Sequence, residues 1–178
     1  GEQGLLLGRY LETLDVEKAI VVGHSYGGSV AVGTALESPD YVAGLIAISA
    51  PTHPWTTGVE RYHDVTKIPV VGRLFSETLI VPYSVSTDAI GGGLQSVFKP
   101  QPVPRTYREE TGPDLILRPW HFRSNSADVS ALLGWVTENE MRYAEISVPT
   151  SIIHGGSDDV VSATLHPEPL SRQIKGSK

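Results

Sequence analysis

The most informative stretch of this sequence is VGHSYGG, residues 22–28. It contains G-x-S-x-G, the pattern of a sharp turn that leads from a strand into a helix and exposes a serine at the carboxyl edge of a parallel sheet. We expect Ser25 to occupy a strained backbone position and to act as a nucleophile. Side chains at Gly23 and Gly27 are expected to collide across the turn, and Gly28 is expected to let helix and strand approach closely.

G-x-S-x-G also occurs by chance, so the segments on either side must show whether it forms a strand-to-helix turn. Residues 19–22 form an apolar run rich in β-branched side chains, typical of a strand buried on both faces of a parallel sheet. Residues 29–36 alternate small and apolar side chains without a proline and end shortly before Pro39, which predicts a helix. Strand, turn and helix therefore follow one another as a nucleophile turn requires.

Periodicity in the rest of the chain predicts an α/β domain. Apolar spacing indicates helices over residues 5–14 and 128–141, the second with Ser126 as its N-cap. Two more buried strands are predicted over residues 43–49 and 148–153. Strands that alternate with helices imply right-handed crossovers and a mostly parallel sheet flanked by helices.

The interval between the last two strands is too long for a plain loop in a compact domain. Residues 51–125 hold most of the prolines and show no long periodicity, so we interpret them as a lid inserted between strands. The glycine run 91–93 is interpreted either as an ordinary turn or as a hinge of that lid. The chain then divides into core residues 1–50, the lid, and core residues 126–178.

Composition narrows the classes of function. The 178 residues suffice for one domain, and the absence of cysteine excludes disulfides, thiolate metal sites and a cysteine nucleophile. A net charge of −6 argues against a nucleic-acid partner, and the apolar runs are far shorter than the roughly 20 residues that span a bilayer. No helical zinc-site spacing is present, so no metal or other cofactor is expected. No secretory leader is visible, which favours the cytoplasm.

The sequence resembles the α/β-hydrolase superfamily, in the branch that contains serine esterases, lipases and cofactor-free haloperoxidase-like hydrolases. Residues 22–28 are close to the form that this family shows, and residues 148–155 resemble its next diagnostic strand. The family often has an acidic residue where Gly156 stands and a proline where Ser162 stands, so the local match is not complete. The resemblance covers nearly the whole chain and implies the α/β-hydrolase fold with an inserted lid.

The resemblance also implies a catalytic triad in the order serine, acid, histidine. Asp158 lies where the family's acid follows the strand, and the adjacent Asp159 is the alternative. The backbone N–H of Tyr26 would be the first donor of the oxyanion hole. The second donor is expected before Gly1, and the histidine on a further strand after Lys178, so we interpret the chain as a partial domain.

Each of the six histidines has a more ordinary explanation than base catalysis. His24 lies within the turn and His154 precedes a glycine at a strand end, so both are expected to pack or to form hydrogen bonds. His166 is the alternative base, because it lies between the acid and the next helix. The other three, expected at the surface of the lid or facing the substrate, are His53, His63 and His121.

These features predict a serine hydrolase, of carboxylesterase type, that acts on a small ester through an acyl-enzyme. Acyl transfer to an acceptor other than water is left open. The alternative is a ligand-binding or receptor-like module that keeps the turn without catalysis. The arginines of the lid are either solvated charges or a group that recognises a carboxylate: Arg73, Arg105, Arg108, Arg118 and Arg123.

Overall fold

The computed structural model describes residues 1–56 and 88–178. The chain divides into two compact units, the first made of Gly1–Trp55 with Leu132–Lys178 and the second of Thr56–Ala131. Most of the segment interpreted as a lid belongs to the second unit, whereas residues 51–55 belong to the first. Two residues singled out above, His63 and Arg73, lie outside the described residues.

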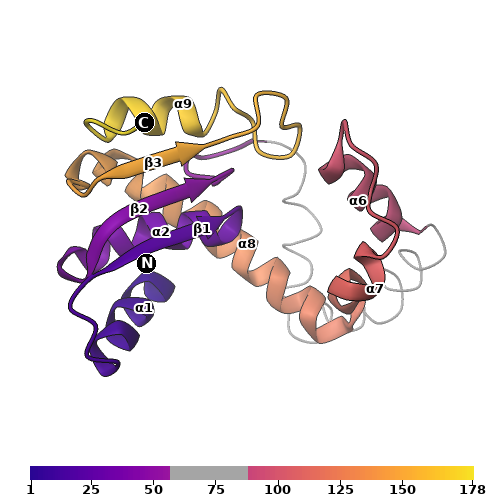
Figure 1. The fold of residues 1–178 in the computed structure, drawn as a ribbon, viewed down its shortest axis with the longest axis horizontal. Helices are drawn as coiled ribbons and strands as arrows, with labels where there is room; N and C mark the ends of the chain where they lie inside the picture. Colours follow the sequence, from indigo (N-terminus) through magenta and orange to yellow (C-terminus); the bar gives the residue numbers. More distant parts are fainter. Residues whose placement is uncertain (57–87) are drawn as a thin grey trace. The chain divides into compact units, whose positions relative to one another are not determined.

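A three-stranded parallel sheet in the order β1-β2-β3 forms the centre of the first unit (Figure 1). The strands and helices of this unit in chain order are α1 (Glu2–Thr13), β1 (Ala19–His24), α2 (Tyr26–Glu37), η1 (Pro39–Tyr41), β2 (Val42–Ile48), the last part of α8 (Pro119–Asn139), η4 (Glu140–Glu145), β3 (Thr150–Ile153) and α9 (Pro167–Gln173). Each predicted strand and its neighbouring helix is present, so the predicted parallel α/β arrangement is confirmed.

One face of this sheet carries the core. Helix α2 packs on β1 and β2, and α9 packs on β3 and η4. Val21 and Leu45 of the sheet are buried with Val32 of α2 in this core. Side chains alternate along a strand, so Ile20 and Val22 lie on the opposite face, where they are 65% and 57% exposed. Within the described residues β1 is thus covered on one face, and its predicted burial on both faces is not observed.

The second unit is helical in its described part. Its elements are α6 (Ala89–Phe98), α7 (Tyr107–Thr111), η3 (Pro113–Leu117) and the first part of α8 (Pro119–Asn139). Glycines 91–93 lie inside α6, which corrects the prediction of a turn or hinge. The carboxylate of Asp88 caps this helix by accepting a hydrogen bond from the Gly91 N–H.

Helix α8 begins seven residues before the predicted N-cap Ser126. Proline is favourable in the first turn of a helix, and Pro119 therefore starts α8 earlier than the apolar spacing alone indicates. Ser126 is buried inside the helix, and its hydroxyl has no hydrogen-bond partner among the described residues. Across the same residues no helix is both long and apolar enough to cross a membrane.

Candidate active site

Ser25 lies at the junction between β1 and α2. Its φ of 52° and ψ of −127° are values that residues other than glycine rarely adopt. Two hydrogen bonds hold this conformation: the Ser25 N–H donates to the carbonyl of Ile48 at 2.9 Å, and its own carbonyl accepts from the Gly28 N–H at 2.8 Å. The strained backbone predicted from the sequence is therefore present, and strain of this kind is typical of functional sites.

The glycines around Ser25 differ in what a side chain would meet. A Cβ at Gly23 would clash with the carbonyl oxygen of Gly27, and one at Gly28 would lie 2.6 Å from the Cβ of Ala50. A Cβ at Gly27 would meet no heavy atom of the described residues within 4 Å. The prediction of a clash is confirmed for Gly23 and wrong for Gly27, because Gly27 is exposed and the space at its Cβ position is open.

We expect Gly23→Ala to lower the free energy of unfolding by about 3 kcal/mol or more, because backbone atoms must move to admit the methyl group. Gly27→Ala is the matched control, with an expected change below about 1 kcal/mol, since α2 gains a better helix former. Urea unfolding of both variants of the whole protein measures the difference. Equal losses of stability would contradict the assigned geometry of the turn.

Asp158 lies in the loop after β3, and its carboxylate is held in place. Its Oδ1 accepts hydrogen bonds from the N–H groups of Val160 at 2.9 Å and Val161 at 2.8 Å. Burial by itself would raise the pKa of this carboxyl, but these two hydrogen bonds, nearby His154 and a hydrogen bond with Ser49 outweigh it and lower the pKa. Asp158 is therefore ionised at neutral pH.

The three parallel strands have their carboxyl ends at one edge of the sheet (Figure 1). Ser25 and Asp158 both follow strand ends and therefore belong to this edge. Ser25 follows β1 and Asp158 lies in the loop after β3, while Ser49 directly follows the intervening strand β2. Ser49 has a φ of 43°, and its N–H donates to the carbonyl of Ile153 at 2.8 Å. Ser49 was not predicted as a site residue, although its position at the end of the second predicted strand could have indicated it. The alternative acid, Asp159, is exposed.

Three other residues predicted near the site, Tyr26, His24 and His154, lie at strand or helix ends. Tyr26 is the first residue of α2, so its backbone N–H lies in the first turn of the helix, beside Ser25. His24 is exposed at the end of β1. His154 is largely buried, and its Nε2 forms a hydrogen bond of 2.8 Å with the carbonyl of Val161. That bond joins the end of β3 to the loop that carries Asp158.

A buried polar network joins the segment after β2 to helix α9. The N–H groups of Thr52 and His53 both donate to His166 Nδ1 at 3.2 Å. The His53 ring bonds to the Thr52 hydroxyl at 2.9 Å and to the Gln173 side chain at 3.1 Å. The Tyr143 hydroxyl donates to the carbonyl of Thr52 at 2.6 Å. His53, expected on the lid, is thus only 6% exposed within the first unit.

These hydrogen bonds argue against His166 as the base. Since Nδ1 accepts two N–H groups, the neutral ring carries its proton on Nε2 and has no lone pair left for a serine proton. Burial first, and then nearby His53 and His154, lower the pKa of His166 to about 4.

His121, in the second unit, forms a hydrogen bond through Nδ1 with the carbonyl of Leu115 at 2.8 Å. Within the described residues, no cluster of three or more His, Asp and Glu is placed to bind a metal.

Stability is expected to fall as pH falls from 6.5 to about 4, because in this range the unfolded chain protonates His166 and the folded chain does not. The free energy of unfolding is expected to fall by about 3 kcal/mol over this pH range. His166→Asn keeps an acceptor for both N–H groups and cannot titrate, so its stability is expected to depend less on pH. Urea unfolding between pH 7 and pH 4.5, with the exposed His24→Asn as control, measures this. Parallel curves for wild type and His166→Asn would refute it.

Comparison with known proteins confirms the fold. Residues 6–63 match the family model of the alpha/beta hydrolase fold. A hydrolase from Pseudomonas aeruginosa is 21% identical with a TM-score of 0.60, over 98% of this chain and 60% of that one. A putative lipase from Acinetobacter baumannii is 19% identical with a TM-score of 0.66, over 98% of this chain and 56% of that one. The chain thus has the α/β-hydrolase fold, as its sequence predicts.

A third relative is similar over a short stretch. Homoserine O-acetyltransferase of Thermus thermophilus is 49% identical over 49 residues, which are 26% of this chain and 13% of that protein. The chain therefore spans a small part of this curated relative and no more than 60% of the two solved structures described above.

Proposed function

We propose that the whole protein is a serine hydrolase of carboxylesterase type, acting on a small ester through an acyl-enzyme. The observation that carries this proposal is the backbone of Ser25, which is strained at the point where a parallel strand passes into a helix. A serine in this position has its hydroxyl directed out of the sheet edge, where a substrate carbonyl can reach it. The similarity in fold to a hydrolase and a putative lipase, and in sequence over 49 residues to a homoserine O-acetyltransferase, supports the same chemistry.

In the proposed reaction the Ser25 Oγ attacks the ester carbonyl carbon while a histidine accepts the hydroxyl proton. The oxyanion that forms accepts a hydrogen bond from the Tyr26 N–H, whose helix N-terminus favours negative charge. The histidine then donates its proton to the leaving alkoxide, and the alcohol departs. Water attacks the acyl-enzyme in the same way and releases the acid. The ionised Asp158 orients the histidine and stabilises its protonated form.

We propose that this histidine is none of the six in residues 1–178. Support comes from the side of β3 that faces away from β2, where no strand of the described residues lies and Lys178 pairs in the pattern of a parallel strand. Its N–H donates to the carbonyl of Thr150 at 3.1 Å, and its carbonyl accepts from the Ile152 N–H at 2.7 Å. A strand that continued this pairing would end at the same edge of the sheet as Asp158, because parallel strands share their carboxyl edge.

Acyl transfer is the second candidate, since the homoserine O-acetyltransferase of Thermus thermophilus is 49% identical over its matched stretch. The two reactions share the attack of the serine and differ in the group that removes the acyl chain from the enzyme. Homoserine in place of water would give an O-acyl product instead of a free acid. A ligand-binding module would form no acyl-enzyme with either acceptor.

The test is to quench the whole protein with acid shortly after mixing it with 4-nitrophenyl acetate and to examine its peptides by mass spectrometry. We expect an acetyl group on the peptide that contains Ser25 and an initial burst of nitrophenol. Free acetate as the only later product identifies a hydrolase, and acetylhomoserine formed on addition of homoserine identifies a transferase. A folded protein without an adduct on Ser25 would refute both and favour the ligand-binding module.

A further inference from the structure

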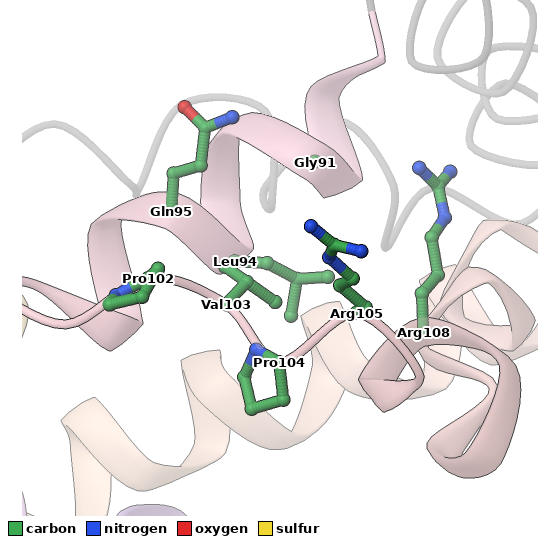
Figure 2. Close-up of a pocket in the computed structure, with 8 residues that line it drawn as sticks. All are labelled: Gly91, Leu94, Gln95, Pro102, Val103, Pro104, Arg105 and Arg108. Carbon is green, nitrogen blue, oxygen red and sulfur yellow. The ribbon is translucent and has the colours of Figure 1, made fainter.

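The second unit contains a cavity of about 430 Å³ between α6 and the segment that leads into α7 (Figure 2). This volume falls in the range of small-molecule sites, about 300–1,000 Å³. The apolar part of its lining comes from Leu94 of α6 and from Val103 and Pro104 of the following segment. The polar part comes from the guanidinium groups of Arg105 and Arg108 and from the side-chain amide of Gln95.

Acidic partners within the second unit neutralise one of these two cations. Arg108 donates through Nε to Asp114 at 2.7 Å and through Nη1 to Asp88 at 2.8 Å, and its Nη2 forms a further bond of 2.5 Å with Asp114. These bonds tie the N-cap of α6 to α7 and η3. Arg108 thus connects the elements that line the cavity, and few of its N–H groups are left to bind a ligand.

The other end of the cavity is also fixed. Phe98, the last residue of α6, packs edge-to-face against Tyr107, the first residue of α7, with ring centroids 4.8 Å apart. The ion pairs at one end of α6 and this aromatic pair at the other hold the cavity open before any ligand binds. A site of this kind binds with less loss of conformational entropy than one that must form around its ligand.

Arg105 has no acidic partner among the described residues, in contrast to Arg108. Figure 2 shows its guanidinium directed toward Leu94 and α6. A guanidinium beside an apolar wall matches a ligand with a carboxylate at one end and a hydrocarbon body at the other. We propose that this cavity binds small apolar carboxylates, with Arg105 as the group that recognises the carboxylate.

This proposal does not depend on the proposed hydrolysis, because all of its residues lie in the second unit and Ser25 lies in the first. The test can therefore use the Ser25→Ala form of the whole protein, so that the result is independent of turnover. The probe is 4-phenylbutyrate, and 4-phenylbutanamide is its uncharged counterpart of nearly equal shape. Binding of both is measured by NMR chemical-shift titration.

We expect the carboxylate to bind about tenfold more tightly than the amide, which is the effect of a charge-assisted hydrogen bond at an exposed site. Arg105→Gln is expected to abolish this difference while leaving amide binding unchanged. Arg118→Gln removes an exposed arginine of the same unit that does not line the cavity, and it is expected to have no effect. Equal affinity for the two probes, or an equal loss in both variants, would overturn the proposal.

Discussion

Ser25→Ala is expected to lower kcat/KM of the whole protein toward short-chain aryl esters by about 10⁴-fold or more. The substitution removes the atom that we propose forms the acyl-enzyme, so the activity that persists should reflect binding and the oxyanion hole alone. The backbone hydrogen bonds of Ser25, to Ile48 and from Gly28, do not involve the hydroxyl. We therefore expect little loss of stability, and initial rates of nitrophenol release with matched unfolding curves measure both quantities.

Ser49→Ala is the matched control for this experiment. Ser49 also follows a strand at the carboxyl edge of the sheet and also has a positive φ, but it directly follows β2 and lies outside the predicted turn. Removal of the Ser49 hydroxyl removes one hydrogen bond to Asp158, so kcat/KM is expected to decrease by less than about tenfold. Similar rates for wild type and Ser25→Ala would exclude Ser25 as the nucleophile, whatever the effect at Ser49.

The sequence predicted the strands and the serine turn because both depend on local patterns. An apolar run followed by G-x-S-x-G determines where β1 ends and where α2 begins. The same reasoning failed at glycines 91–93, since a side-chain cap from Asp88 and the apolar residues around them stabilise a helix despite three poor helix formers. It also failed at Ser126, because the true start of α8 is at Pro119.

The histidine network could not be predicted for a different reason. His166 accepts hydrogen bonds from residues 113 and 114 positions earlier, and no local pattern encodes a contact of that separation. His53 is buried because Tyr143, Thr52 and α9 surround it, and its sequence context shows only a proline-rich loop. A polar residue next to a strand end can thus belong to the core, even when composition places it at a surface.

Asp158→Asn is expected to lower kcat/KM by about 10³- to 10⁴-fold, with Asp159→Asn as a control that changes it less than about threefold. Asparagine can still accept hydrogen bonds from Val160 and Val161 through its single oxygen, so the loop is expected to keep its shape. It lacks the negative charge that stabilises a protonated histidine. The loss should therefore appear mainly in kcat, measured at substrate saturation with 4-nitrophenyl esters.

The pair of variants also decides which of the two adjacent acids acts. Asp158 is partly buried and has a lowered pKa, so its charge is retained at neutral pH and is aimed by two backbone N–H groups. Asp159 is exposed, and water screens its charge from the sheet edge. A large loss at Asp159 alone would reverse the assignment. Full activity in both variants would mean that neither carboxylate orients the base, and the acid would then have to be sought on another strand.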